Sequence, residues 1–276
     1  MDTLQELPLD QWPLLREKLK ILWPTNVAGY YALDTNIKHS PLREAFNFRV
    51  YCPYGSLDNG FVAISVKNEE EYIIFSIDEN INKLGEALEN TKLIDWNSKV
   101  GIGMATSLTI RLMENLKIRM KFKTFDVWEA KMFHLDKRSK LYDDVKCPPD
   151  TYLAAVTPDN IKQVDDTWPF QYPTSHFYFS TLASNGLSYG LYSLEKKLIA
   201  WIFLNEYNFL CHLYCESSHR RKGYGEYLMK YVSNECLKQG NDVFGYVVPG
   251  NLKARELFTK LGYLLIDESA WMNVRR

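Results

Sequence analysis

The order of apolar and polar residues predicts a chain in which helices and strands alternate. Apolar side chains recur at helical spacing from about residue 9 to 22, and short runs rich in strand-forming residues follow. Breaks at Asn59-Gly60 and at 68–71 separate these runs as hairpin turns would. The front half is therefore predicted to contain strands near 46–52, 60–67 and 71–77, helices at about 80–95 and 104–117, and a strand-like run from 118 to 134.

A boundary is predicted at residues 143–150, where charged residues and paired prolines forbid regular structure. It separates two predicted domains, 1–146 and 150–276. Interleaved helices and strands predict an α/β (α+β) fold with a mixed, mostly antiparallel sheet flanked by helices, and a degenerate copy of it in the front half. The second domain is predicted to contain strands at 152–156, 187–193, 198–204, 209–215 and 243–248, helices at 158–168 and 174–184, and a terminal hairpin at 263–275.

The most informative stretch is a basic loop, Arg220-Arg221-Lys222-Gly223-Tyr224-Gly225, between an apolar strand and an amphipathic helix. A strand that turns through glycines into a helix points free backbone N–H groups outward at the positive end of the helix dipole. Glycines let an anion approach the main chain, and the three cations strengthen the attraction, so we predict a pyrophosphate site. The loop is no Walker motif, because Glu226-Tyr227 follow Gly225 where lysine and serine or threonine would stand.

A second strand-to-helix turn follows the basic loop and its helix. Residues 243–248 have the composition of a buried strand, which Pro249-Gly250 breaks. Asn251 can cap the next helix, which carries Ala254 and Phe258 on its apolar face before Gly262 ends it.

Together the two blocks resemble the GNAT superfamily of acyl-CoA-dependent N-acyltransferases. Arg220, Gly223 and Gly225 match the family's Arg/Gln-x-x-Gly-x-Gly/Ala loop, and Asn251, Ala254 and Gly262-Tyr263 match its later Asn-x-x-Ala helix and closing Gly-aromatic pair. The resemblance covers roughly residues 150–276 and implies the GNAT fold. Within the superfamily the chain is most similar to the glycine N-acyltransferase group, at Leu93–Trp96, Val164–Trp168 and Ala200-Trp201.

The resemblance implies an enzyme that moves an acetyl or longer acyl group from CoA to the amine of a small acceptor, glycine or another amino acid or amine, in a ternary complex. Acetyl-CoA or a longer acyl-CoA is the implied co-substrate, and no metal is implied. In the family an unpaired strand edge takes the pantetheine amides, here at Leu213, Tyr214 and Cys215, and the loop amides take the pyrophosphate. Asn251, Ala254 and Phe258 complete the implied cofactor contacts.

This chain departs from the family at the residues for proton transfer. The family's glutamate base falls at Phe209, and its tyrosine acid falls at Phe258. Glu206 in the preceding turn and His212 in the strand are the remaining titratable candidates for the base. Their ordinary interpretations are a solvated turn for Glu206 and a packing role for His212, which is out of phase with position 209. A water relay, or use of an already neutral amine, stays open.

Two other segments have alternative interpretations. Lys99–Gly103 also precedes a helix, but the segment before it has a helical pattern and only one cation adjoins the glycines. We therefore predict a helix start there and no second cofactor site. The aromatic segments Thr167–Tyr172 and Ser175–Tyr178 suit an acceptor pocket and a domain-interface core equally well.

Composition limits the other classes of function. With 33 basic and 34 acidic residues the net charge is −1, so no global field recruits nucleic acid. No stretch approaches the roughly 20 apolar residues of a membrane span. Five cysteines without a secretory signal suit a reducing compartment. Cys211 and Cys215, about 13 Å apart along an extended strand, are predicted to be core residues and not a metal site or disulfide.

These limits predict a cytoplasmic protein whose partner is a small molecule, not nucleic acid or membrane. The N-terminal sequence lacks an arginine-rich presequence. The glycine N-acyltransferase group includes mitochondrial members, however, so the resemblance leaves matrix residence open. A rival interpretation is a non-catalytic acyl-CoA-binding or interaction protein, because Phe209 and Phe258 replace both proton-transfer groups.

Overall fold

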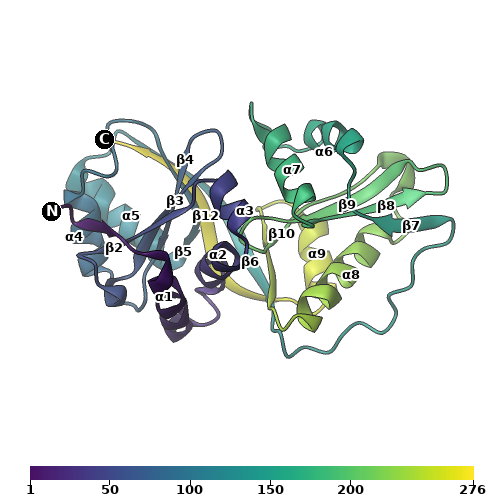
Figure 1. The fold of residues 1–276 in the computed structure, drawn as a ribbon, viewed down its shortest axis with the longest axis horizontal. Coiled ribbons are helices and arrows are strands. Elements are labelled where there is room, and N and C mark those ends of the chain that lie inside the picture. The colour runs from purple at the N-terminus through teal and green to yellow at the C-terminus, as the bar shows by residue number, and fades with distance from the viewer. The chain divides into compact units, whose positions relative to one another are not determined.

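The computed structural model describes residues 1–276, and the chain divides into two compact units. Unit 1 comprises Met1–Met132, Val247–Gly250 and Leu265–Arg276, and unit 2 comprises Phe133–Tyr246 and Asn251–Leu264. Figure 1 shows the yellow C-terminal strand among the purple and blue elements of unit 1. Each unit consists of a sheet with helices packed on it.

Unit 1 is built on a mixed sheet whose neighbours follow the order β1, β2, β3, β4, β5, β12 and β6. β4 and β5 are parallel, whereas β1–β2, β2–β3, β3–β4 and β5–β12 are antiparallel. The strands are β1 (Leu4–Glu6), β2 (Arg49–Pro53), β3 (Phe61–Val66), β4 (Glu70–Phe75), β5 (Val100–Thr106), β6 (Thr124–Leu135), whose last residues enter unit 2, and β12 (Leu264–Arg275).

Apolar faces of two helices close the core of unit 1. Leu84 and Leu88 pack with Leu112 and Leu116 against the strands, and all four are at most 2% exposed. Burying a side chain of this size contributes roughly 1.5–3 kcal/mol. The helices of unit 1 are α1 (Trp12–Lys18), flanked by the short 3₁₀ turns Leu9–Gln11 and Leu19–Leu22, α2 (Val27–Lys38), α3 (Ser40–Ala45), α4 (Asn82–Asn90) and α5 (Ser107–Met120).

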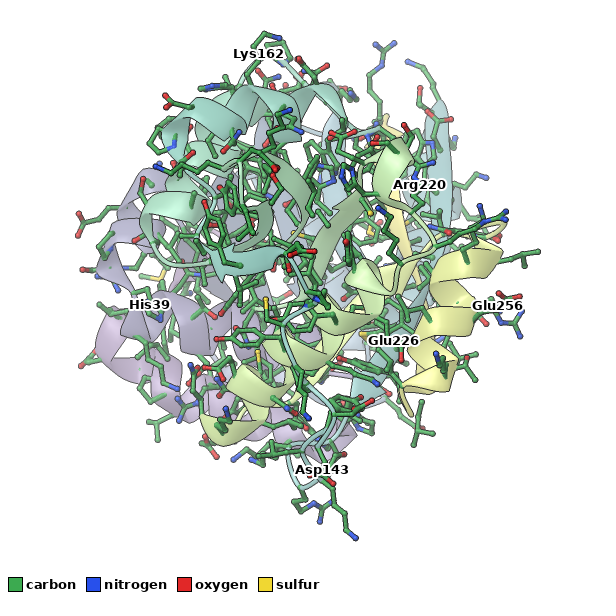
Figure 2. All side chains as sticks on the ribbon, turned by 90° about the vertical axis from the view of Figure 1, so that its right-hand side faces the viewer. His39, Asp143, Lys162, Arg220, Glu226 and Glu256 are labelled. Atoms are coloured by element: carbon green, nitrogen blue, oxygen red, sulfur yellow. The ribbon has the colours of Figure 1, made fainter.

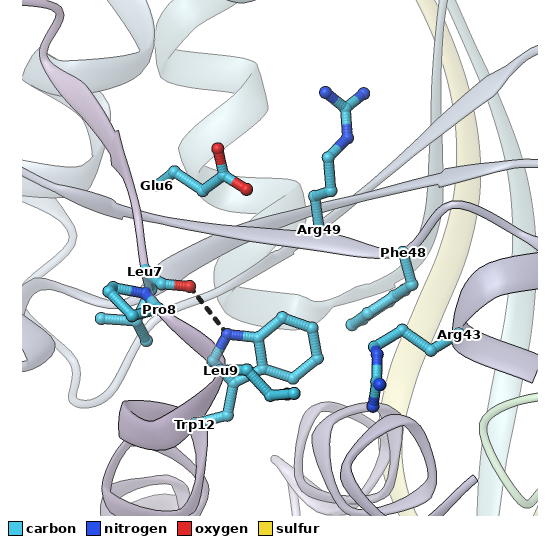
Figure 3. Close-up of a pocket in the computed structure, with 8 residues that line it drawn as sticks. All are labelled: Glu6, Leu7, Pro8, Leu9, Trp12, Arg43, Phe48 and Arg49. Carbon is cyan, nitrogen blue, oxygen red and sulfur yellow. Dashed lines mark hydrogen bonds between the residues drawn. The ribbon is translucent and has the colours of Figure 1, made fainter. Parts of the chain in front are cut away.

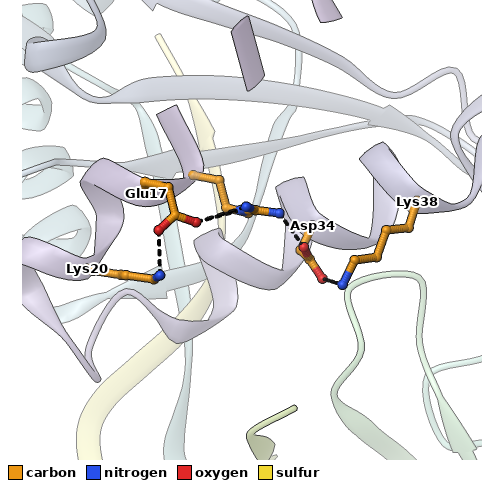
Figure 4. A network of polar contacts seen from close by, with 5 residues as sticks. Glu17, Lys20, Asp34 and Lys38 are labelled. Carbon is orange, nitrogen blue, oxygen red and sulfur yellow. Dashed lines mark hydrogen bonds and ion pairs between the residues drawn. The ribbon is translucent and has the colours of Figure 1, made fainter. Parts of the chain in front are cut away.

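Charged side chains tie α1 to α2 (Figure 4). The buried Asp34 carboxylate accepts from Arg16 Nη1 at 2.6 Å and from Lys38 Nζ at 2.7 Å. Arg16 also binds Glu17, which in turn binds Lys20. With two cationic partners the carboxylate of Asp34 is compensated inside the fold, as a buried charge must be.

The strands of unit 2 follow the order β11, β10, β9, β8 and β7. β10 and β11 are parallel, and the other pairs are antiparallel. Within unit 2, α6 and α7 cover one face of the sheet, and α8 and α9 cover the other (Figure 1). The elements are β7 (Thr151–Ala154), α6 (Ile161–Asp166), α7 (Ser175–Ser184), β8 (Ser188–Ser193), β9 (Leu198–Leu204), β10 (Leu210–Cys215), α8 (Tyr224–Lys238), β11 (Val243–Val247) and α9 (Leu252–Lys260).

Both units contain the same supersecondary unit, a parallel strand pair joined by one helix. In unit 1 it is β4–α4–β5, and in unit 2 it is β10–α8–β11. Parallel neighbours require a crossover of this kind. The mixed, mostly antiparallel strand order with flanking helices in both units confirms the predicted α/β (α+β) class and the repeat in the front half.

The sequence-based prediction for residues 99–103 is wrong. These residues open β5, a strand with pairs to both β4 and β12, and not a helix start. Glycine suggested a turn, but Gly103 lies in the strand where a Cβ atom would collide with the Glu71 side chain. The residue that departs from strand geometry is Met104, at φ +52°.

The terminal hairpin predicted at 263–275 is also wrong, because these residues form the single strand β12. It pairs with β5, with Ala270 opposite Ala105 and Met272 opposite Ile102. Residues 265–276 thus group with unit 1, whereas the predicted division placed them in the second domain. Local sequence does not encode which sheet a strand joins. Independent folding of 1–146 and 150–276 stays a prediction.

Other boundaries differ in detail. The predicted helix at 9–22 is an α-helix between two 3₁₀ turns, and α2 and α3 fill a stretch for which the pattern gave no element. The segment 143–150 contains no helix or strand, as predicted from its charged residues and prolines. No helix of the chain is long and apolar enough to cross a membrane.

Candidate cofactor and acyl-transfer site

The first feature of the site is a strand that leaves its neighbour. β10 pairs with β9 from Leu210 opposite Leu204 to Cys215 opposite Ala200, but with β11 only at Leu210 opposite Gly245. Residues 213–215 therefore have no partner on the β11 side. An open strand edge of this kind can pair with the amide groups of an extended ligand.

A β-bulge lies at the same place. The register between β10 and β9 shifts between Cys211 and Tyr214, and His212 adopts φ +48°. A non-glycine residue in the left-handed region is uncommon and costs conformational energy. The bulge bends β10 at the point where it separates from β11.

The basic loop connects this strand to α8. Arg221 and Gly223 both adopt left-handed backbone angles, at φ +64° and +81°, and α8 begins at Tyr224. No side chain caps the helix at Gly223, and a Cβ atom there would meet nothing within 4 Å. The N–H groups of the first turn therefore have no side-chain acceptor from the N-cap residue. An anion site at this loop stays a prediction.

The three cations of the loop differ in their contacts. Arg220 folds back onto the strand, where its Nε donates to the Cys215 carbonyl at 3.0 Å and its guanidinium lies 5.5 Å from the Tyr214 ring centre. Tyr214 stacks in turn on Trp201 at 4.8 Å. Arg221 and Lys222 are exposed, and no carboxylate forms an ion pair with them. Figure 2 shows Arg220 on the side of unit 2 that faces the viewer.

The second strand-to-helix turn has the predicted geometry. The Asn251 side chain accepts from the Ala254 N–H at 3.2 Å, which confirms the predicted cap of α9. Phe258 is buried, and its ring lies 5.4 Å from Phe133 and 4.9 Å from Tyr263. A Cβ atom at Gly245 would come within 2.9 Å of the Phe258 ring, so this glycine makes room for it.

His212 lies inside an aromatic layer and not in an open cleft. The rings of Phe179, Trp201 and Trp168 lie 5.1, 5.9 and 6.3 Å from the imidazole. Its Nε2 lies 2.8 Å from the Val164 carbonyl, and because a carbonyl only accepts, Nε2 carries the proton. Burial lowers the pKa of His212 to about 4, so the imidazole is neutral at pH 7.

Glu206 is not the solvated turn residue that its sequence position suggests. It is 1% exposed, and its carboxylate accepts from the Tyr178 hydroxyl at 2.8 Å. Burial and the neighbouring carboxylate hold the pKa of Tyr178 well above its usual value. A short turn that packs under α7 explains the burial, which hydropathy could not show.

Aromatic side chains occupy the position of the absent base. Phe209 contacts Tyr246 at 5.0 Å and Phe244 at 6.0 Å between ring centres. No carboxylate or imidazole stands at position 209. The two strands are thus held together by apolar contact at the point where they begin to diverge.

The two aromatic segments named from the sequence meet in unit 2. Trp168 contacts Tyr172 and Tyr178, at 5.7 and 6.0 Å, while Phe170 and Phe177 are more than half exposed. Sequence reasoning missed Asp165 in this region. Its buried carboxylate accepts from Ser175 Oγ and Gln171 Nε2 and so fixes the turn between α6 and α7.

A cavity of about 430 Å³ lies elsewhere, in unit 1, between β1, the first turn of the N-terminal helix and β2 (Figure 3). Trp12 forms part of its wall and donates through Nε1 to the Leu7 carbonyl at 2.9 Å. None of the predicted site residues lines it. No group of three or more His, Cys, Asp or Glu side chains is placed to hold a metal ion.

Comparison with known proteins identifies the fold. The sequence family "FR47-like protein" matches residues 188–272, and a domain of unknown function, DUF5645, matches residues 3–116. Among curated proteins no sequence matches the chain. A Drosophila protein of known structure is 20% identical, with a TM-score of 0.85 over 99% of this chain and 98% of that one.

Two other solved structures name the architecture. A tandem GNAT protein from the clavulanic acid biosynthesis pathway has a TM-score of 0.56 at 12% identity, over 98% of this chain and 97% of that one. An acetyltransferase of the GNAT family from Colwellia psychrerythraea has a TM-score of 0.53 at 14% identity, over 99% of both chains. The chain therefore has the GNAT fold in a tandem arrangement, as predicted.

Proposed function

We propose that this protein is an acyl-CoA-dependent N-acyltransferase whose cofactor site lies in unit 2. The observation that carries the proposal is the separation of β10 from β11 directly before the uncapped start of α8. This arrangement offers a strand edge and an anion site in succession, which suits an extended ligand with amides at one end and phosphates at the other. The FR47-like match spans both features.

The residues have distinct proposed roles. Leu213, Tyr214 and Cys215 pair through their main chain with the pantetheine amides, and a main-chain N–H near Cys215 polarises the thioester carbonyl. Arg220 to Gly225 receive the pyrophosphate. Asn251, Ala254 and Phe258 border the cofactor through α9, with Asn251 also fixing the start of that helix.

In the proposed reaction the acceptor amine attacks the thioester carbonyl, the C–S bond breaks and CoA leaves as thiolate. The amine must lose a proton, and no side chain is well placed to take it. Phe209 cannot, and His212 has a pKa of about 4 and is enclosed by aromatic rings. Glu206 is buried against Tyr178. We therefore propose deprotonation by water or by the acceptor's own equilibrium.

For the acceptor we propose a small amine or amino acid, with glycine favoured by the similarity to glycine N-acyltransferases. The region between α6 and α7 supports an acceptor with an apolar part, because Phe170 is exposed beside Trp168 and Phe177 is exposed on α7.

A second candidate function is a non-catalytic acyl-CoA-binding protein. The observation in its favour is that Phe209 and Phe258 stand at both proton-transfer positions and are packed against other rings. Both candidates predict CoA binding, and only the enzyme predicts turnover.

The two are separated by thiol release from acetyl-CoA and longer acyl-CoAs in the presence of an amine panel, with products identified by mass spectrometry. For the enzyme, activity should climb with pH toward the acceptor's own pKa. His212→Ala and Glu206→Gln should each reduce the rate less than the roughly 10²–10⁴-fold of a lost general base. Saturable CoA binding without thiol release from any pair would instead establish the binding protein.

A further inference from the structure

The basic loop is followed by a carboxylate that could compete with its ligand. Gly223 is the N-cap of α8, which places Glu226 at the third helical position. A glutamate at this position commonly folds back to accept a hydrogen bond from the N–H of the N-cap residue. Here that N–H belongs to the proposed pyrophosphate site, so Glu226 is a potential internal competitor for phosphate.

In the structure two lysines hold the carboxylate elsewhere. Lys260 Nζ of α9 lies 2.5 Å from Glu226 Oε2, and Lys230 Nζ, one turn along α8, lies 3.0 Å from Oε1. Each carboxylate oxygen thus has its own cation. Hydrogen bonds from Lys260 and then Lys230 lower the pKa of Glu226, so it stays ionised and bound to them.

Lys230 is itself fixed by the segment that precedes unit 2's sheet. Its Nζ lies 2.8 Å from Asp144 Oδ2 and 5.9 Å from the Tyr142 ring centre. Tyr142 exchanges two hydrogen bonds of 2.9 Å with the Asn234 side chain on α8. Lys230 is only 14% exposed, so it is held in one place beside the first turn of the helix.

We propose that Lys230 and Lys260 are positioning residues that keep Glu226 off the main-chain N–H groups of the anion site and thereby set the affinity for the pyrophosphate of CoA. The inference rests on the proposed function and adds a determinant of affinity to the same site. Without the lysines the carboxylate can cap the helix, and its charge repels the phosphates at close range.

The test is isothermal titration of the full-length protein with CoA. Lys260 is 63% exposed, so Lys260→Met should fold normally. We expect it to raise the Kd by about 3- to 10-fold, the size of an uncompensated charge near the ligand at a partly exposed site. Glu226→Ala should restore the wild-type Kd in the Lys260→Met background, because the competitor is gone.

Two matched controls lie outside the network. Lys238 forms a similar lysine–glutamate pair at the other end of α8, and Glu256 is an exposed carboxylate on α9, labelled in Figure 2 with Glu226. Lys238→Met and Glu256→Ala should leave the Kd unchanged. Rescue by Glu226→Ala separates positioning from a structural role, because loss of packing at Lys260 would not be repaired by a second deletion.

The outcomes distinguish this inference from the proposed function. If wild-type protein fails to bind CoA, the cofactor site itself is refuted. If wild type binds and Lys260→Met binds equally well, or if the loss in Lys260→Met persists in the double variant, the site stands and the role of the lysines is refuted.

Discussion

The two crossover loops of the molecule occupy equivalent places and have opposite character. In unit 1 residues 76–81 connect β4 to α4, and in unit 2 residues 216–223 connect β10 to α8. We call the first the acidic loop, because it carries Asp78 and Glu79 where the second carries three cations. The same fold thus presents one loop that attracts an anion and one that repels it.

The loops differ equally in their backbone N–H groups. In the acidic loop Asp78 Oδ1 accepts from the Asn80 N–H at 2.8 Å, and Asn80 Oδ1 accepts from the Asn82 N–H at 3.2 Å. These side chains satisfy donors that a phosphate would otherwise need. Neither helix has a side-chain hydrogen bond from its N-cap residue. In the basic loop, however, no side chain accepts from the first helical N–H as Asn80 does from Asn82.

The strands in front of the loops differ in how far each stays paired with its parallel neighbour. β4 stays paired with β5 over three successive positions, from Glu71 opposite Gly101 to Ile73 opposite Gly103, whereas β10 keeps one position with β11. Unit 2 therefore has the longer open strand edge, because β4 leaves only Ile74 and Phe75 beyond its pairs with β5. The comparison teaches that two copies of one topology can differ in the length of the open strand edge and in the polar groups at the helix start.

The largest expected effect comes from making the basic loop resemble the acidic one. Gly223→Asp places a side chain and a negative charge at a left-handed position beside the phosphates. We expect the CoA affinity to fall by about 100-fold or more, because charge repulsion and backbone strain act together. Isothermal titration measures the change.

Gly240, at the other end of α8, provides the control. It has a similar φ of +73° and open space around its Cβ position. Gly240→Asp should reproduce the strain and leave CoA binding intact. An unchanged affinity in Gly223→Asp would remove the basic loop from the site.

The next prediction concerns the pH dependence of stability, which His212 in the bulge before the basic loop should cause. The pKa of His212 is about 4 in the folded protein and 6.5 in the unfolded chain, so the unfolded state binds more protons between these values. The contribution of the neutral His212 imidazole to the free energy of unfolding is therefore fully present above pH 6.5, and it is lost as the pH falls toward 4. We expect the free energy of unfolding to drop by about 1–2 kcal/mol from pH 7.5 to pH 5 through this group.

His212→Gln isolates the contribution, because glutamine does not titrate and its Nε2 amide can still donate to the Val164 carbonyl, which the imidazole Nε2 binds at 2.8 Å. Urea unfolding at the two pH values should show a smaller loss in the variant than in wild type. Equal losses would mean that another group titrates and that the imidazole is not buried as described.

These differences also explain which features of the fold and of the candidate site could be predicted from the sequence. The basic loop, the cap at Asn251 and the two domains' class of fold follow from local patterns, because glycine, charge and capping residues act within a few positions. The acidic loop was not recognised as the counterpart of the basic one. The glycine pattern instead drew attention to Lys99–Gly103, which lies at the start of β5, the strand that follows α4.

What stayed hidden depends on contacts between distant residues. The burial of Glu206 requires Tyr178, 28 positions away, and the place of β12 requires β5, more than 150 positions away. The separation of β10 from β11 was expected only through the family resemblance. A short segment of sequence does not identify such distant partners. The glycine and charge patterns of the basic loop could be recognised because they do not depend on distant partners.

Substitution of the three cations of the basic loop should change the CoA affinity by a smaller factor, and Arg220 should differ from the other two. Arg221 and Lys222 are unpaired, so Arg221→Gln and Lys222→Gln should each raise the Kd for CoA a few-fold at low salt, and less at high salt because ions screen exposed charges. Arg220 is engaged with Cys215 and Tyr214, so Arg220→Lys should lower the melting temperature as well as the affinity. Lys197→Gln, on an exposed turn of the same unit, is the neutral control for titration and melting curves.

The smallest expected effect on CoA binding comes from a change in the acidic loop of unit 1. If the acidic loop binds no phosphate, Asp78→Ala should leave the Kd and the stoichiometry of about one CoA per chain unchanged, because one basic loop holds one pyrophosphate. The variant should still lose roughly 0.5–1 kcal/mol of stability, since the Asn80 N–H loses its acceptor. Titration calorimetry and urea unfolding measure the two quantities on the same sample. Two equivalent sites in wild type, or a Kd that changes in Asp78→Ala, would show that unit 1 also binds the cofactor and that the two loops differ less in function than in charge.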